Sequence, residues 1–137
     1  MLLQNPTSEW YSDATLVYSC QYHVIWCTKY RRKVLTQPMQ DLLHHLICSK
    51  QTEWDFRLRA CEIMSDHVHL ILENNPKVPI ARTVGLIKGV TSKSLRDEFP
   101  ELKSRLPCLW TRSKFISSVG SVTLAVVKQY IENQKNV

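Results

Sequence analysis

Apolar and polar residues alternate along two stretches of the chain, and two others are rich in aromatic and β-branched residues; both patterns are typical of β-strands. We therefore predict strands at residues 17–29, 56–64, 68–72 and 109–119. A short turn at Ser65 and Asp66 would join the second and third strands into a hairpin. Within residues 56–64 the alternation predicts one face with Phe56, Leu58 and Ala60 and an opposite face with Arg57, Arg59 and Cys61.

Two further stretches, residues 35–53 and 80–99, repeat apolar residues every three or four positions, which is typical of amphipathic helices. Gly120, followed by Ser121 as an N-cap, predicts a last helix near the C-terminus. The resulting order predicts an α+β fold of the ferredoxin-like or RRM-like type, a split βαβ antiparallel sheet with helices on one face. The additional C-terminal helix, which carries Tyr130, is free to cover the other face.

The length of 137 residues and a hydrophobic content of 44% predict a single domain spanning residues 1–137, with residues 1–14 as an irregular N-terminal segment. A net charge of +6 favours a polyanionic partner, although many proteins without one are equally basic. No apolar run is long enough to cross a membrane, and Glu9 and Asp13 do not suit a signal peptide, so we expect a cytoplasmic protein. The five widely spaced cysteines predict buried, reduced thiols.

The sequence Asp66-His67-Val68-His69 contains the first candidate for chemistry. On a strand, both histidines share the face opposite Val68, where neutral imidazoles could bind a divalent cation. A lone pair of histidines with this spacing is more often structural, but a core role does not explain the polar face. Asp66 could orient a histidine or form the turn, and we favour the turn.

Tyr130 and Gln134 lie four residues apart, so they would project from the same side of the last helix. Tyr130 is in line with apolar neighbours, and ordinary packing is its simplest interpretation. Beside two histidines and a metal ion, however, its hydroxyl could become a nucleophile, and the Gln134 carbonyl could be a third metal ligand.

Basic residues that could grip a DNA backbone occur in two places. One group follows the first strand, and the other shares one side of the second predicted helix with Gly85 and Gly89, which would let a large partner approach closely. Solvated surfaces are the alternative interpretation of both groups. The two groups are Lys29, Arg31, Arg32 and Lys33, and Arg82, Lys93 and Arg96.

From Tyr18 to Gln134 the chain resembles the single-tyrosine transposases of small bacterial and archaeal insertion sequences, which belong to the histidine-hydrophobe-histidine endonuclease superfamily. The resemblance is carried by Tyr22-His23-Val24-Ile25-Trp26-Cys27-Thr28-Lys29-Tyr30-Arg31-Arg32-Lys33, Asp66-His67-Val68-His69, Leu109-Trp110-Thr111-Arg112-Ser113, Phe115-Ile116-Ser117 and Tyr130-Ile131-Glu132-Asn133-Gln134.

The resemblance implies a transposase that excises and inserts its element as single-stranded DNA, recognises hairpins near the element ends and needs no ATP. By matching position, Tyr130 is the nucleophile, and His67, His69 and Gln134 are the ligands of Mg²⁺ or Mn²⁺. The resemblance also implies a homodimer with composite active sites, in which one subunit supplies the tyrosine and the other the histidines.

Two alternatives remain open from the sequence. A non-catalytic RRM-like RNA-binding module would use the same order of elements, but it should display stacking aromatic residues on its central strands. A domesticated relative would cut chromosomal hairpins as a single-strand endonuclease without moving an element.

Overall fold

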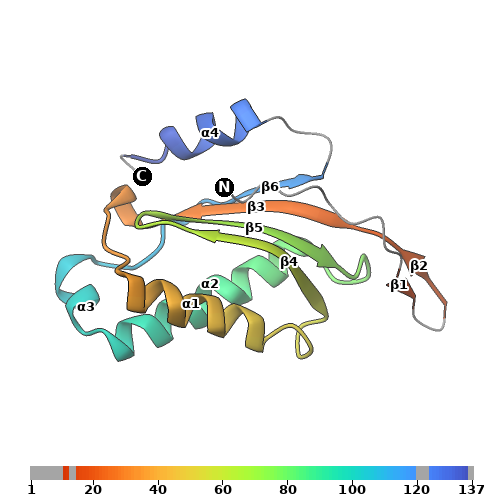
Figure 1. Cartoon of the computed structure of the whole chain (residues 1–137), viewed down its shortest axis with the longest axis horizontal. Helices are drawn as coiled ribbons and strands as arrows, with labels where there is room; N and C mark the ends of the chain where they lie inside the picture. Colours follow the sequence, from red (N-terminus) through yellow and green to blue (C-terminus); the bar gives the residue numbers. More distant parts are fainter. Residues whose placement is uncertain (1–10, 13–14, 120–123, 136–137) are drawn as a thin grey trace.

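The computed structural model describes residues 11–12, 15–119 and 124–135. Its main elements follow the predicted order, as Figure 1 shows. They are β3 (Gln21–Cys27), α1 (Gln37–Ser49), β4 (Phe56–Ile63), β5 (His67–Asn74), α2 (Ile80–Glu98), β6 (Phe115–Ser118) and α4 (Leu124–Glu132). Two short helical segments, η1 (Lys29–Arg31) and α3 (Glu101–Arg105), lie between them.

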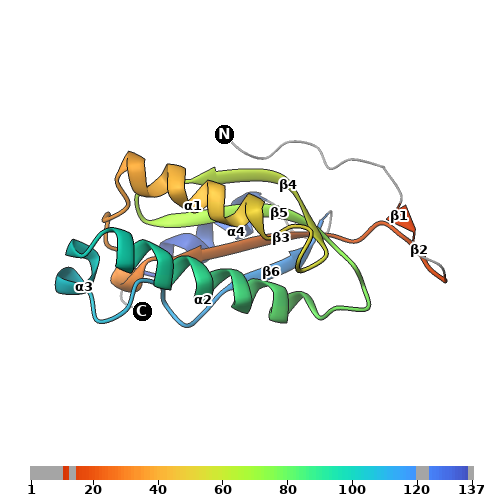
Figure 2. The same cartoon turned by 90° about the horizontal axis from the view of Figure 1, so that it is seen from below.

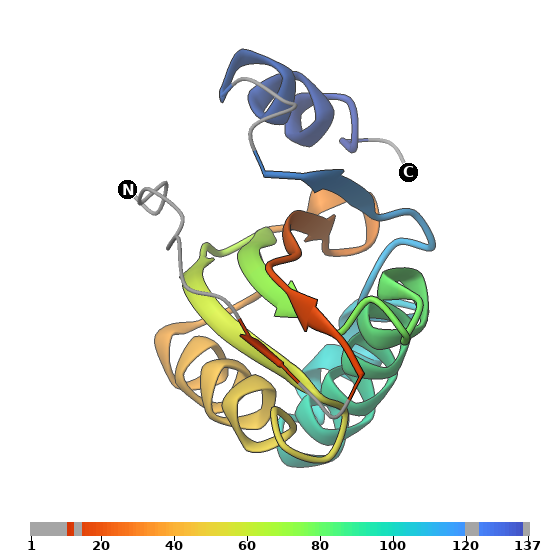
Figure 3. The same ribbon diagram turned by 90° about the vertical axis from the view of Figure 1, so that its right-hand side faces the viewer.

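The four strands form an antiparallel sheet with the order β4-β5-β3-β6. Helices α1 and α2 cover one face of this sheet, and α4 lies over the other, which is clearest in Figure 3. Figure 2 shows α1 and α2 side by side beneath the strands. The predicted split βαβ arrangement with helices on one face is therefore confirmed.

The hydrophobic core fills the space between the sheet and the α1–α2 layer. Trp26 is completely buried and meets the ring of Trp110 edge to face, with ring centroids 5.8 Å apart. The indole nitrogen of Trp110 donates a hydrogen bond to the Thr91 hydroxyl at 3.2 Å. Burial of each large apolar side chain contributes roughly 1.5–3 kcal/mol, so this layer stabilises the packing of the sheet against its helices.

The N-terminal strand is shorter than predicted, because residues 17–29 do not form one continuous strand. Val17–Tyr18 is a separate strand, β2, which pairs with β1 at Tyr11–Ser12. Within the segment predicted to be irregular, Tyr11 and Ser12 thus form a short strand, whereas residues 1–10 and 13–14 lie outside the described part of the chain. The ring centroids of Tyr11 and Tyr18 are 5.9 Å apart, and the Arg57 guanidinium of β4 lies 3.6 Å from the centroid of the Tyr11 ring, which links the small sheet to the main one.

A β-bulge in β4 overturns the predicted alternation of that strand. The pairing with β5 shifts between Leu58 and Ala60, which inserts one extra residue. After the bulge, Cys61 packs against the core beneath the sheet, and Ala60 packs against Ile71 on the opposite face. The face of Ala60 and Cys61 was therefore predicted wrongly, since alternation alone cannot reveal an inserted residue.

The strand predicted at residues 109–119 is reduced to the four residues of β6. Trp110 instead forms an isolated bridge with Thr28, and its burial draws the chain down toward the core before β6 begins. Gly120 and Ser121, expected at the start of the last helix, lie outside the described residues. Among the described helices, none combines the length and apolar content needed to cross a membrane. All five cysteines are described and are free thiols, but only Cys27 is buried.

Candidate functional site

The two histidines of β5 lie on the sheet face that α4 covers. Val68 and Leu70 point into the core beneath the sheet, so strand alternation directs His67 and His69 to the other side. His69 is only 1% exposed, and the His67 side chain is 15% exposed. The predicted division of this strand into an apolar face and a histidine face is confirmed.

A third histidine, His23 of β3, lies beside His69. Its Nδ1 atom is 3.3 Å from Nε2 of His69, and the two ring centroids are 5.5 Å apart. Burial, with smaller contributions from His23 and His67, lowers the pKa of His69 to about 4. Burial also lowers the pKa of His23. Both imidazoles are thus kept neutral, which is the form that can share a proton with its neighbour or bind a cation.

The sequence favours a turn-forming role for Asp66, but in the structure its side chain also contacts a histidine. Its Oδ1 atom lies 2.7 Å from Nδ1 of His67, and the residue is 8% exposed. A carboxylate in this position orients the imidazole and leaves Nε2 free to face outward. The backbone carbonyl of Asp66 also accepts hydrogen bonds from Thr28, so the residue contributes to the turn as well.

Tyr130 and Gln134 meet at the hydroxyl of Ser113. The Tyr130 hydroxyl donates to Ser113 Oγ at 3.3 Å, and Ser113 Oγ donates to Gln134 Oε1 at 2.7 Å. The Tyr130 ring also contacts Phe115 of β6, with centroids 5.1 Å apart. Tyr130 lies within α4, whereas Gln134 lies in the turn that follows it and is 8% exposed.

The loop that presents Ser113 is fixed from the opposite side by Lys88 of α2. The Lys88 ammonium donates to the carbonyl oxygens of Thr111 at 2.6 Å and Ser113 at 3.1 Å. Burial raises the pKa of Tyr130, and the hydrogen bond to Ser113 opposes this shift only in part. The phenol is therefore protonated in this arrangement and needs a further positive charge before it can act as a nucleophile.

The predicted metal ligands have suitable chemistry for a divalent cation. The imidazoles of His67 and His69 and the amide oxygen of Gln134 are all accepted types of ligand, and the Asp66 contact leaves one His67 nitrogen available. Within the described residues, however, no three His, Cys, Asp or Glu side chains are gathered closely enough to hold an ion by themselves. The glutamine would therefore be needed to complete the set.

The basic residues predicted to bind DNA differ in their surroundings. Arg32 and Lys33 are exposed beside η1, but the side chain of Arg31 is only 16% exposed and makes internal contacts. On α2, Arg82 and Lys93 are exposed, and Lys93 pairs with Asp97 at 2.9 Å. The remaining members are Lys29, which lies 4.9 Å from the Tyr30 ring, and Arg96, which donates to the Pro107 carbonyl at 3.5 Å. Binding of DNA by these residues remains a prediction.

The exposed side of α2 is open at both of its glycines. A Cβ atom placed at Gly85 or Gly89 would have no heavy atom within 4 Å apart from those of the adjoining helix backbone and chain neighbours. The glycines are thus not required for packing within this chain.

Three residues of the site were missed or misread in the sequence. Strand alternation could have placed His23 on a polar face, but its contact with His69 depends on the register between β3 and β5. Ser113 belongs to a motif that carries the family resemblance, but no local pattern pointed to its contacts with Tyr130 and Gln134. Arg31 resembled its basic neighbours in the sequence, and only the structure shows that its side chain is shielded and paired with Asp66.

The comparisons with known proteins agree on one family. Residues 16–134 match the sequence model of the family described as "Transposase IS200 like". The ISDra2 transposase TnpA of Deinococcus radiodurans is 35% identical over 120 residues, which cover 86% of this chain and 86% of that protein. The transposase for insertion sequence element IS200 of Salmonella typhimurium is 30% identical over 120 residues, and this aligned region covers 85% of this chain and 78% of that protein.

Two solved structures resemble the fold. A candidate transposase from Deinococcus radiodurans R1 superimposes with a TM-score of 0.84 at 35% identity, covering 93% of this chain and 99% of that one. A REP-associated tyrosine transposase bound to a REP hairpin superimposes with a TM-score of 0.55 at 14% identity, covering 89% of this chain and 69% of that one. At this level of identity the likeness shows only that the two proteins share a fold. From the family match and these relatives, we conclude that the chain belongs to the IS200-like transposase family.

Proposed function

We propose that this transposase cleaves and rejoins single-stranded DNA at the ends of an insertion sequence through a covalent bond between Tyr130 and a 5′-phosphate. The observation that carries the proposal is the meeting of Tyr130 and Gln134 on one Ser113 hydroxyl, at the end of a helix that covers the histidine face of the sheet. A phenol, an amide oxygen and imidazoles are the groups that such a reaction needs.

In the proposed step, the Tyr130 oxygen attacks the phosphorus of a phosphodiester. A bond forms between the tyrosine oxygen and phosphorus, the bond to the 3′-oxygen breaks, and the released 3′-oxygen takes up a proton. Because the energy of the phosphodiester is retained in the tyrosyl link, the 3′-hydroxyl of another strand can reverse the step without ATP.

His67, His69 and Gln134 would hold Mg²⁺ or Mn²⁺, which when bound would polarise the scissile phosphate and stabilise its developing charge. His69 suits this role because its lowered pKa keeps it neutral at physiological pH. The Gln134 carbonyl oxygen already accepts a hydrogen bond from Ser113, and its second lone pair would be available to the ion.

We propose that the protein acts as a homodimer in the cytoplasm. The DNA that it recognises would be single-stranded hairpins near the element ends. The hairpin bound to the REP-associated transposase supports this shape of substrate, because that protein shares the fold. An RNA-binding module is disfavoured by the central strands β3 and β5. Tyr22 and Trp26 of β3 point toward the core, and on the opposite face, which α4 covers, these two strands carry histidines rather than stacking aromatic residues.

The decisive experiment incubates the protein with single-stranded DNA from the flanks of its gene, labelled at the 3′ end, in Mg²⁺ or Mn²⁺. A denaturing gel should show a protein-linked labelled fragment. Tyr130→Phe should abolish this adduct while keeping the fold, because the substitution removes only the attacking oxygen. Tyr22→Phe is the matched control and should form the adduct as the unmodified protein does. An adduct that persists in Tyr130→Phe would remove Tyr130 from the mechanism.

A further inference from the structure

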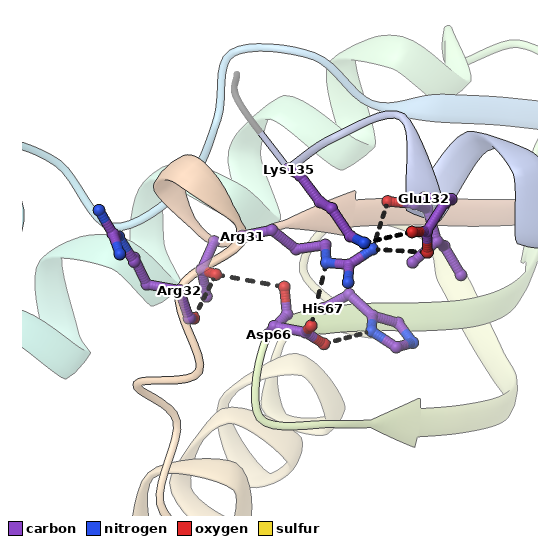
Figure 4. A network of polar contacts seen from close by, with 8 residues as sticks. Arg31, Arg32, Asp66, His67, Glu132 and Lys135 are labelled. Atoms are coloured by element: carbon purple, nitrogen blue, oxygen red, sulfur yellow. Dashed lines mark hydrogen bonds and ion pairs between the residues drawn. The ribbon is translucent and has the colours of Figure 1, made fainter.

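The guanidinium of Arg31 lies between α4 and the histidine strand. Its Nη1 atom donates to the Ile131 carbonyl and to the Glu132 carboxylate, each at 3.2 Å, and its Nε atom lies 3.2 Å from Asp66 Oδ2. Figure 4 shows this side chain reaching from η1 to both elements. One residue thus contacts the end of the tyrosine helix and the loop before β5.

The Asp66 carboxylate extends this contact to His67. One of its oxygens is occupied by Arg31, and the other lies 2.7 Å from Nδ1 of His67. When Nδ1 carries the proton that Asp66 accepts, the ring has a fixed tautomer and presents Nε2 as its free nitrogen. The orientation of His67 therefore depends on a carboxylate that Arg31 also holds.

The two ion pairs of Arg31 are not equivalent. Both side chains of the Arg31–Asp66 pair are shielded, at 16% and 11% exposure, whereas Glu132 is 57% exposed. Solvent screens the exposed pair, so the attachment to Asp66 is the stronger of the two. Glu132 also pairs with Lys135, which further divides its charge.

An uncommon backbone conformation directs Arg31 inward. Tyr30 has φ 57° and Arg31 has φ 50°, the left-handed region that residues other than glycine rarely adopt. Thr28 holds the turn, because its hydroxyl donates to the Arg32 carbonyl at 2.6 Å and its backbone amide donates to the Asp66 carbonyl at 3.0 Å. The next residue, Arg32, returns to an extended conformation and is exposed.

We propose that Arg31 is a positioning residue that couples the docking of α4 to the orientation of His67. The inference rests on the proposed function of Tyr130 and His67, but it concerns the protein before DNA or metal binds. Asp66 shares no described hydrogen bond or ion pair with α4, so any effect of Asp66 on that helix must pass through a neighbour such as Arg31. Coupling of this kind is reciprocal: a docked helix fixes the imidazole, and a fixed imidazole favours the docked helix.

The test measures two properties of the protein without metal or DNA. Hydrogen exchange reports the opening of α4, and ¹⁵N chemical shifts of the His67 ring report its tautomer. In Arg31→Ala we expect exchange in residues 128–132 to become at least about fivefold faster, because local opening becomes easier. We also expect His67 to lose its single tautomer. Arg31→Lys should restore part of both properties, since it keeps the charge but lacks the fork that reaches both partners.

Arg32→Ala is the matched control, because it removes the same charge from an exposed neighbour, and it should match the unmodified protein in both measurements. If Arg31→Ala does not fold, Asp66→Asn carries the test: it should accelerate exchange in α4, although residue 66 makes no described polar contact with that helix. Unchanged exchange and unchanged His67 shifts in Arg31→Ala, or unchanged α4 exchange in Asp66→Asn, would overturn the coupling. Because neither measurement involves cleavage, a missing Tyr130 adduct would instead count only against the proposed function.

Discussion

The imidazole of His69 is almost completely withdrawn from solvent, and its burial makes folding sensitive to pH. Burial lowers its pKa from the ordinary 6.5 to about 4. Between these two values the unfolded chain binds more protons at this position than the folded protein does. Stability should therefore fall as the pH decreases from about 6.5 toward 4, and this contribution should be intact above 6.5.

This expectation can be measured by urea unfolding at pH 7.5 and at pH 5. His69→Gln should show a smaller loss of unfolding free energy between the two pH values than the unmodified protein, because glutamine does not titrate. His45→Gln, an exposed position on α1, is the control and should leave the pH dependence unchanged. An equal loss in His69→Gln and the unmodified protein would show that His69 does not contribute to the pH dependence.

At the scale of elements, η1 and α2 present the exposed basic side chains that we predict to bind DNA. Affinity for a single-stranded hairpin should decrease steeply as salt rises, because each phosphate contact releases counterions. Replacing Arg32 and Lys33 by alanine should reduce the slope of log K against log salt by roughly 1.4–1.8, which is about 0.7–0.9 for each of the two lost contacts. Exposed Arg82 and Lys93 of α2 should behave similarly.

Binding titrations over a series of salt concentrations provide this measurement. Lys50→Ala is a suitable control, because Lys50 follows α1 and contacts Glu53 and the Trp54 ring. Its replacement should leave the slope unchanged. If Arg32→Ala with Lys33→Ala also leaves the slope unchanged, these side chains only solvate the surface.

At the scale of the whole molecule, the position of α4 decides whether an active site belongs to one subunit or two. In the single chain, α4 lies over its own sheet, and the segment before it, residues 120–123, is outside the described residues. We predict composite sites, in which Tyr130 of one subunit faces His67 and His69 of the other. Symmetric exchange of a terminal helix is a common way for identical subunits to share a site.

Mixing two inactive variants tests the composite arrangement. A Tyr130→Phe subunit combined with a subunit carrying His67→Ala and His69→Ala should regain cleavage, because one site of the heterodimer then has both intact histidines and an intact tyrosine. Sites formed within one chain would leave every site defective. Background cleavage, after subunit exchange has been demonstrated by mass spectrometry, would exclude composite sites for the cleavage step.

The sequence by itself determined the order of the elements and the two faces of β5. These properties are local, since strand alternation and helical periodicity depend on neighbouring residues. The same reasoning placed Tyr130 and Gln134 within one turn of each other, and the quoted motifs identified the family that the comparisons confirm. Local patterns could not detect the bulge in β4, because the bulge is a shift in the pairing with β5 and leaves no mark in the hydrophobic pattern of β4 itself.

Only the tertiary structure decided which groups meet across the sheet. The contact between His23 and His69 requires the register of β3 against β5, and the bridge from Arg31 to Asp66 requires a left-handed turn far from Asp66 in sequence. Ser113 reaches Tyr130 and Gln134 from a loop whose backbone carbonyl groups accept hydrogen bonds from Lys88 of α2. These contacts join residues that are distant along the chain, and their geometry is set by packing and strand pairing rather than by the identity of nearby residues.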